Sequence, residues 1–539
     1  MDIKKHLINK EIKRHLKVSK GYRLLRELNQ LDFLDNLKIQ FAETPLVAIS
    51  NSSKFIIIDS KEVTVEIAIR QFVLQRFIGI NFNKEILSCL ADKTKKFNYP
   101  LPLEWQNIIS SSGIKVNKIG CNFFWLIEMF KLWLYAGYEF LKQFFFSLRF
   151  NFSLKENKKK KFIYFDSLGD TNIPNESGHY KYGILTWFLN LYKPNDIDYF
   201  AHGCSTKSEI TLNEKICVKY LRSPILPPFS LVLLLLFVVN SIYRLFFSLI
   251  FLFCGSWWRT ILLRDSLLVK IISLNKGKGI ALNYLFHNSG WIYRPLWTYT
   301  AEKYYSEIIF YFYSTNVERF KKPKKDNPIV NSWNLVSWPN YLVWDKFQSD
   351  FIKKVSNVSF LDRIVGPISF VCSDLSNLSL PHNFIAVFDV QPVRETYYNS
   401  LGLDQEYYIP EVANAFLSDI FEAISSKNVS IALKRKRNIG KLVHSKYLSK
   451  LGYLNEYHKF IDIEPSTPAE YIIENCNAVI SMPFTSTALI GVHFGKPSIY
   501  YDPSGLIMKD DPAAHGVEII SGLVELKLWI KNLNIYNNE

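Results

Sequence analysis

The sequence predicts a mixed α/β protein with two parallel-sheet domains that follow a helical region. Three observations lead to this prediction: the chain is long, it is rich in apolar residues, and strand-like and helix-like segments alternate along much of it. It has 539 residues, 48% of them hydrophobic, which is enough to form several cores. Apolar strands that alternate with helices indicate a parallel sheet covered on both faces.

Residues 1–120 are predicted to be mainly helical and to carry no recognisable chemistry. The first thirty residues contain no continuous apolar stretch, so we do not expect a signal peptide. Their isoleucines and leucines recur at helical spacing between lysines and arginines. This pattern indicates a basic amphipathic helix.

An apolar segment at residues 123–150 follows this region. Its polar residues recur every three or four positions and form one stripe on a helix otherwise covered by aromatic and leucine side chains; they are Glu128, Lys131, Tyr135, Glu139 and Lys142. Such a helix is expected to lie in the headgroup plane of a membrane or against a partner.

A second apolar segment, residues 227–258, is long enough to span a bilayer, which takes about 20 apolar residues. Asn240, Arg244 and Ser248 nevertheless share one face, and Arg244 at mid-membrane would cost about 2.5–3.5 kcal/mol. Basic residues flank the segment on both sides, which places both ends on the same side of a membrane. We therefore favour a helix at the membrane surface; a buried helix pair and a true crossing are the alternatives.

The first α/β domain is expected at residues 121–375, with the two apolar helices inserted in it. Residues 161–168 and 196–203 have the composition of strands, and residues 180–192 between them have helical spacing. Together they form a βαβ unit. A further strand is predicted at residues 307–314.

The second α/β domain is expected at residues 376–539, after a stretch at 366–383 that is rich in serine, asparagine and proline. Strands are predicted at 383–392, 428–437, 458–465, 477–482 and 496–502, and helices at 411–426, 468–476, 485–494 and 517–533. Two Rossmann-like domains with a cleft between them, and a final helix that can cross back, make up the architecture of GT-B glycosyltransferases. We therefore predict a GT-B-like arrangement.

The charge of the chain restricts its partners. The formal net charge is +16 and the pI is about 9.2, which favours nucleic acid, acidic headgroups or phosphorylated small molecules. No RRM, KH or helix-turn-helix pattern is visible and much of the charge flanks apolar helices, so we do not expect nucleic acid binding. The seven cysteines are scattered without C-x-x-C spacing, as is typical of reduced thiols in a cytosolic protein.

Loops that follow strands of the second domain are the candidate donor site, because ligands bind at the carboxyl ends of parallel strands. Hydroxyls before a helix and a cluster of cations there could hold phosphate oxygens. The structural alternatives are an ordinary helix cap and a solvated charged face. The predicted binding residues are Lys434, Arg435, Lys436, Arg437, Thr485, Ser486, Thr487, Gln391 and Arg394.

A base for an acceptor hydroxyl is sought in the first domain. Glu176 and His179 are the preferred catalytic candidates, with Asp166, Asp170 and His287 as further ones; for each, a structural role is the alternative. No D-x-D motif follows a strand, because residues 196–198 lie at the start of theirs. We therefore expect no bound metal and no cofactor.

Six motifs in order, within residues 280–520, are the basis of a family resemblance. They are YRPLWTYTAE (293–302), FYFYSTN (310–316), YLVWDKFQ (341–348), RIVGPISF (363–370), VFDVQPVR (387–394) and SMPFTSTALIGVHFGKPSIYYD (481–502). Together they resemble the surface-polysaccharide biosynthesis proteins named for their Pro-Phe-Thr-Ser motif. The resemblance implies a role in making bacterial capsule or lipopolysaccharide O-antigen, as a glycosyltransferase.

These observations combine into one functional hypothesis. We expect a metal-independent transferase at the cytoplasmic face of the bacterial inner membrane. It would take a nucleotide-sugar donor on the second domain and a lipid-linked or growing glycan on the first. The alternative is a non-catalytic assembly or regulatory protein of the polysaccharide machinery that keeps a degenerate nucleotide-sugar fold.

Overall fold

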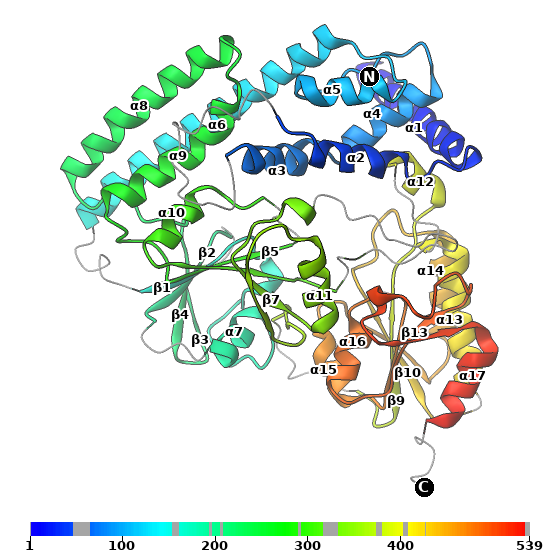
Figure 1. The fold of residues 1–539 in the computed structure, drawn as a ribbon. Coiled ribbons are helices and arrows are strands. Elements are labelled where there is room, and N and C mark those ends of the chain that lie inside the picture. Colours follow the sequence, from blue (N-terminus) through cyan, green and yellow to red (C-terminus); the bar gives the residue numbers. More distant parts are fainter. Residues whose placement is uncertain are drawn as a thin grey trace.

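The protein consists of a helical layer above two α/β domains that lie side by side (Figure 1). The computed structural model describes residues 2–46, 65–153, 161–192, 197–204, 209–288, 293–315, 318, 333–372, 380–402, 408–425, 427–483 and 485–533. The predicted boundary between the α/β domains, at residues 375 and 376, lies outside the described residues.

The N-terminal region is mainly helical, as predicted. Its helices are α1 (Asp2–Glu27), α2 (Phe33–Glu43), α3 (Val65–Phe77), α4 (Ile80–Ala91) and α5 (Leu103–Ser111). Phe41 and Trp105 are fully buried and stack with ring centroids 4.7 Å apart. Burial of large aromatic side chains holds these short helices together, since isolated helices of this length are marginal in water.

Three long helices form the rest of the upper layer (Figure 1). They are α6 (Lys118–Ser153), α8 (Leu231–Phe253) and α9 (Trp258–Leu274), and each packs against the other two. The polar stripe of α6 is turned partly inward: Glu139 is buried, and its Oε2 lies 3.6 Å from Nε of Arg264 in α9. The indole Nε1 of Trp133 donates to the carbonyl oxygen of Leu245 in α8 at 2.9 Å.

The first α/β domain contains an eight-stranded sheet in the order β3-β4-β2-β1-β5-β6-β7-β8. All neighbours pair in parallel except β3 with β4. The chain first builds outward from β1 on one side and then from β5 on the other, so the switch point lies between β1 and β5. The strands are β1 (Phe162–Phe165), β2 (Tyr199–His202), β3 (Ile210–Leu212), β4 (Ile216–Tyr220), β5 (Asn283–His287), β6 (Glu307–Tyr311), β7 (Asn340–Val343) and β8 (Leu361–Ile364).

Helices α7 (Ile184–Tyr192), α10 (Trp297–Lys303) and α11 (Lys346–Val355) belong to the same domain. Short 3₁₀ helices cover Asp170–Asn172 and Trp333–Leu335 here, and Pro512–Ala514 in the second domain.

The second domain contains a six-stranded parallel sheet in the order β11-β10-β9-β12-β13-β14. Numbered from β9, this is the Rossmann order 3-2-1-4-5-6, with the switch point between β9 and β12. The strands are β9 (Phe384–Asp389), β10 (Ser430–Arg435), β11 (Phe460–Ile463), β12 (Ala478–Ser481), β13 (Ser498–Asp502) and β14 (Glu518–Ser521). The helices are α12 (Glu395–Ser400), α13 (Pro410–Ser425), α14 (Ser445–Leu454), α15 (Ala469–Asn475), α16 (Thr487–His493) and α17 (Gly522–Asn532).

The C-terminal segment differs from the predicted helix at 517–533. Its first residues form the edge strand β14, because the apolar run around Ile519 and Ile520 completes the sheet beside β13. Gly522, with φ of +75°, turns the chain from this strand into α17. Helix α17 packs on α13, β13 and β14, within its own domain.

The two α/β domains contact each other through loops at the carboxyl ends of their strands. Nδ1 of His515, after β13, lies 2.8 Å from Oδ2 of Asp345, which follows β7. The backbone N–H of Thr315, after β6, donates to Oγ of Ser486, after β12, at 3.3 Å. These contacts bring the functional edges of the two sheets together.

Candidate active site

The switch point of the second sheet is the first place where a ligand is expected. Strands β9 and β12 are neighbours here and end at Asp389 and Ser481. In open parallel sheets the ligand binds outside the carboxyl ends of the strands at the switch point. Residues 390–394 and 482–486 leave these two strand ends and therefore border the candidate donor crevice.

The hydroxyls of the second of these loops bond mainly to one another and to the first domain. Thr485 Oγ1 donates to the carbonyl oxygen of Met482 at 2.7 Å, and Thr487 Oγ1 lies 2.8 Å from Ser481 Oγ. Ser486 Oγ lies 3.3 Å from Oγ1 of Thr315, and it does not cap the seven-residue helix α16. Phe484 lies outside the described residues. The hydroxyls thus fix the loop and its contact with Thr315.

The four consecutive cations do not all lie in a loop. Strand β10 continues to Arg435, so Lys434 and Arg435 belong to the strand, and only Lys436 and Arg437 follow it as exposed side chains. Nε of the buried Arg435 donates to Oδ1 of Asp462 at 2.8 Å. Burial lowers the pKa of Lys434, an effect that the buried carboxyl of Glu470 opposes. Lys436 and Arg437 are therefore the two cations of this run accessible to a ligand, although partial desolvation of the ammonium and the neighbouring Arg437 lower the pKa of Lys436.

A buried carboxyl stands at the end of the central strand of the same sheet. Asp389 accepts a hydrogen bond from the hydroxyl of Tyr447 in α14, a helix that the sequence did not predict. Complete burial raises the pKa of Asp389 to about 7, although Tyr447 and the nearby Arg435 oppose the shift. Its Oδ1 has no hydrogen-bond partner among the described residues.

The remaining two predicted donor residues have different surroundings. Nε2 of Gln391 donates to the carbonyl oxygen of Arg437 at 2.8 Å, which ties the loop after β9 to the loop after β10. Arg394, at the end of the loop after β9, is exposed and lines a cavity shared with α1. The structure thus brings Gln391 close to the cation run and places Arg394 in the lining of the cavity beside α1.

The switch point of the first sheet holds the other half of the candidate site. Asp166 and Ser167 follow β1, and His287 ends the neighbouring strand β5. Nε2 of His287 donates to the carbonyl oxygen of Ser167 at 3.2 Å, and the imidazole is only 8% exposed. Burial lowers the pKa of His287, so the ring is neutral at pH 7 and its Nδ1 is the acceptor nitrogen.

The two preferred catalytic candidates lie elsewhere in this domain. Residues 177–180 run beside the outer edge strand β3, which is separated from β1 by β4 and β2. Glu176 is exposed, and Nε2 of the exposed His179 lies 3.3 Å from Oε1 of Glu214. The catalytic role of Glu176 and His179 stays a prediction, and the structure does not place them at the switch point.

The expected absence of a metal also stays a prediction. Within the described part of the chain, no group of three or more His, Cys, Asp or Glu side chains could hold a metal ion.

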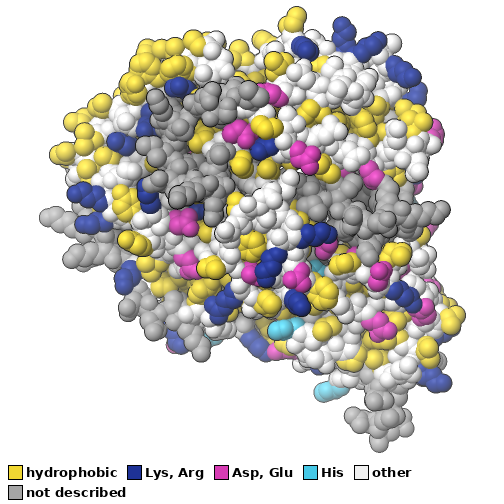
Figure 2. Space-filling view, viewed as in Figure 1, with side chains coloured by type: hydrophobic (Ala, Val, Ile, Leu, Met, Phe, Trp, Pro, Cys, Tyr) yellow, Lys and Arg dark blue, Asp and Glu magenta, His cyan; other side chains and the backbone are white. Residues whose placement is uncertain are grey.

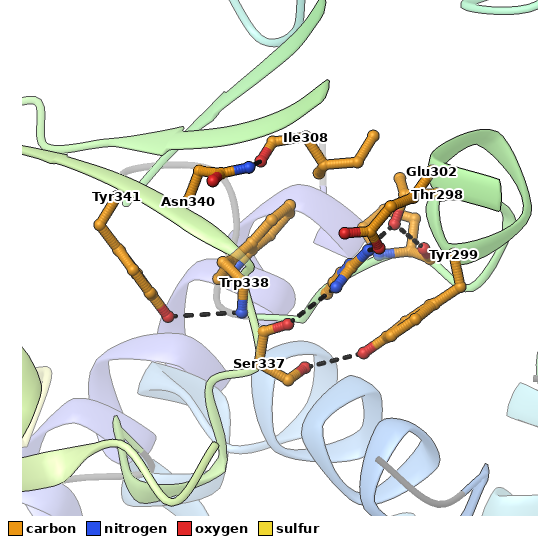
Figure 3. Close-up of polar contacts among 10 residues, drawn as sticks. Thr298, Tyr299, Glu302, Ile308, Ser337, Trp338, Asn340 and Tyr341 are labelled. Atoms are coloured by element: carbon orange, nitrogen blue, oxygen red, sulfur yellow. Dashed lines mark hydrogen bonds and ion pairs between the residues drawn. The ribbon is translucent and has the colours of Figure 1, made fainter. Parts of the chain in front are cut away.

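The YRPLWTYTAE motif has a structural role that its sequence alone did not reveal. Nε of the buried Arg294 donates to Oγ1 of Thr298 at 3.1 Å, Nη1 donates to the carbonyl oxygen of Ser337 at 3.1 Å, and Nη2 pairs with Glu302. Figure 3 shows these three partners, together with Tyr299, around one group of dashed contacts. The guanidinium lies 3.7 Å from the ring centroid of Tyr299, whose hydroxyl is 3.0 Å from Ser337 Oγ. These contacts fasten α10 to the chain before β7.

Two Rossmann-like sheets that contact each other through loops at their carboxyl edges, below an N-terminal helical region, define a GT-B-like protein. Residues 243–530 match the model of the polysaccharide biosynthesis PFTS motif proteins. This match covers more than half of the chain, which therefore belongs to that family. No curated protein matches the chain by sequence.

Several solved structures are similar to this chain at low sequence identity. The wall teichoic acid polymerase TagF has 10% identity and a TM-score of 0.38, over 76% of this chain and 89% of that one. UDP-GlcNAc 2-epimerase from Methanocaldococcus jannaschii has 9% identity and a TM-score of 0.34, over 70% and 93%. The glycosyltransferase SnogD from Streptomyces nogalater has 9% identity and a TM-score of 0.33, over 69% and 94%.

Proposed function

We propose that the protein is a membrane-associated glycosyltransferase of bacterial surface polysaccharide (capsule or O-antigen) biosynthesis. It would transfer a sugar from a nucleotide-sugar donor to a lipid-linked or growing glycan. The observation that carries this proposal is the contact between Thr315 and Ser486. Because it joins the carboxyl edges of the two sheets, a donor on the second sheet and an acceptor on the first would meet in one cleft.

The donor phosphates would lie near the loops after β9, β10 and β12. Lys436 and Arg437 are exposed there and would neutralise the departing nucleoside diphosphate, the task that a metal ion performs in other transferases. Gln391 orients the second of these loops through its bond to the Arg437 carbonyl. Thr485 and Ser486 would keep the loop after β12 in place rather than donate to the phosphates directly.

The acceptor would lie near His287. With Nε2–H held by the Ser167 carbonyl, Nδ1 of the neutral imidazole can take the proton of an acceptor hydroxyl. The hydroxyl oxygen would attack the anomeric carbon while the bond from that carbon to the phosphate oxygen breaks, and the nucleoside diphosphate would leave. Glu176 and His179 are the alternative bases, each requiring the acceptor to reach the edge of the sheet.

Membrane association would place the cleft near a lipid-linked acceptor at the cytoplasmic face of the inner membrane. Large apolar side chains point outward along α8 and α6, and Figure 2 shows apolar side chains gathered at the upper left, where α8 lies. By length and composition, α8 is the one helix among the described residues that could cross a membrane. The outward side chains of α8 include Leu231, Val232, Leu235, Leu236, Val239, Ile242, Tyr243, Phe246 and Phe253.

A panel of nucleotides tests the transferase proposal by thermal shift. We expect one of UDP, GDP, TDP or CMP to raise the melting temperature, and Lys436→Met with Arg437→Met to remove that shift. Because Lys450 lies on α14 and not in the loops at the crevice, Lys450→Met serves as a control that removes a single charge outside those loops.

The non-catalytic alternative is favoured by one observation: the hydroxyls of Thr485, Ser486 and Thr487 already bond within the protein. If no nucleotide changes the melting temperature and purified protein shows no transfer, the assembly role replaces the transferase role.

A further inference from the structure

A cavity of about 510 Å³ separates the N-terminal helix from the second α/β domain. One wall is a single face of α1, with Ile12, His15, Leu16 and Ser19 at helical spacing. The opposite wall consists of Arg394, residues of α12 and residues 441–445 at the start of α14. Sites for small molecules usually enclose about 300–1,000 Å³, so the cavity is large enough for a ligand.

The backbone holds two cations together on the second wall. Val393 and Val443 form an antiparallel bridge, and the N–H of His444 donates to the carbonyl oxygen of Pro392 at 3.0 Å. This pairing sets Arg394 opposite residue 442, next to Lys441. Both side chains line the cavity.

No carboxylate neutralises these cations. Among the described residues that line the cavity none is acidic, and no ion pair of Arg394 or Lys441 is present in the described part of the chain. Two acids near this wall pair with other cations: Glu395, the first residue of α12, with Arg26 at 3.0 Å, and Glu411 in α13 with Lys446 at 3.4 Å. The exposed Glu11 of α1 lies 3.8 Å from Nε2 of His15 in the lining. A concave site whose two cations have no carboxylate partner favours an anion.

His444 adds a donor to this site. Its Nδ1 accepts the N–H of Lys446 at 3.2 Å, so the neutral ring carries its proton on Nε2. The hydroxyls of Ser19, Thr396 and Ser445 lie in the same lining. A phosphate group, with several acceptor oxygens, can use donors of this number and kind.

The cavity also has apolar surface. Ile12 and Leu16 are 51% and 65% exposed, and Leu442 is 56% exposed on the opposite side. Lysine or glutamate would be the usual residues at such exposed positions. An apolar group attached to the phosphate would cover Ile12, Leu16 and Leu442.

We propose that this cavity binds the phosphate or diphosphate of an ester whose organic part is apolar, at a site separate from the donor crevice between β9 and β12. The phosphate would contact Arg394, Lys441 and His444, and the apolar part would lie against α1. The chemistry is that of a phosphorylated lipid, and the same cations would accept free pyrophosphate more weakly. Binding at this site does not require that the protein be a transferase.

The test uses the full-length protein and two probes, inorganic pyrophosphate by calorimetry and phosphatidylcholine vesicles with or without a long-chain polyprenyl phosphate. Removing one charge-assisted contact weakens binding about tenfold, so Arg394→Met with Lys441→Met should weaken it about a hundredfold. Lys13→Met with Lys20→Met removes the same charge from exposed positions of α1 and should leave cavity binding unchanged. Ser19→Trp, which fills the cavity, should also abolish binding.

Each outcome decides the proposal. Cavity-dependent preference for vesicles with polyprenyl phosphate supports a lipid ligand, and cavity-dependent binding of pyrophosphate alone supports a free phosphate ligand. Equal affinity of the Arg394/Lys441 variant and the control for every probe overturns the proposal. Loss of nucleotide binding in that variant, equal to the loss in Arg437→Met, also overturns it, because the cavity would then be part of the donor site. Unchanged melting temperatures without ligand show that the variants fold.

Discussion

Replacement of Asp389 by asparagine should change how stability depends on pH. The pKa of Asp389 is about 7 in the folded protein and about 3.9 in an unfolded chain. Between these values the folded protein holds a proton that the unfolded chain releases, so the free energy of unfolding falls as pH rises. Over about three pH units at 1.36 kcal/mol each, the loss amounts to about 4 kcal/mol between pH 4 and pH 8.

The asparagine side chain would accept the same hydrogen bond from Tyr447 through its amide oxygen, without a titrating group. We therefore expect Asp389→Asn to be more stable than the natural protein at pH 8, and the difference to shrink toward pH 4. Urea unfolding at a series of pH values measures it, with the exposed Asp350→Asn as a control that follows the natural protein. Parallel stability curves for Asp389→Asn and the natural protein would refute the reasoning, since they would mean that Asp389 is ionised at no cost.

Three further predictions concern the catalytic base, the YRPLWTYTAE motif and the apolar surface of α8. His287→Asn should reduce transfer about 10²- to 10⁴-fold without changing nucleotide affinity, whereas Glu176→Gln and His179→Asn should have little effect; the reverse order would assign the base to the sheet edge. Arg294→Lys should lower stability by about 2–4 kcal/mol because lysine cannot reach Thr298, Ser337 and Glu302 together, and an unchanged melting temperature would contradict this. Leu235→Glu with Val239→Glu should move the protein from the membrane fraction to the supernatant while its nucleotide-induced thermal shift persists.

Much of the second domain could be predicted because its strands are short, apolar and bounded by polar loops. The strands at 384–389 and 478–481 were located to within a few residues, and the rule for parallel sheets then placed their loops at one edge. Strand β14 and helix α14 were missed. Strand β14 has only four residues and leads directly into α17, so the sequence pattern does not separate it from the first turn of that helix. The lysines and tyrosines of α14 interrupt the apolar spacing by which its buried face could have been recognised.

The candidate site was harder to predict because its contacts join distant parts of the chain. Nothing in the sequence indicates that Ser486 lies within hydrogen-bonding distance of Thr315, or that Arg394 lies near α1. The cation run was recognised, but charge alone does not show that Arg435 would be buried against Asp462. His287 was among the weaker candidates because only the topology reveals that β5 is next to β1.

The ion pair between Arg26 and Glu395 has a consequence for synthesis of the protein. The two residues are 369 positions apart in the chain. A ribosome that adds about 5–20 residues per second needs about 20 to 70 seconds after the synthesis of Arg26 to reach Glu395. For that interval α1, with its lysines and its exposed Ile12 and Leu16 side chains, has no second α/β domain to contact. Helix α4, which packs on α1, is synthesised early. A chaperone or an anionic bilayer would therefore be the first partner only of the α1 surface that later contacts α12, and attachment of the nascent chain to the membrane would precede completion of the fold.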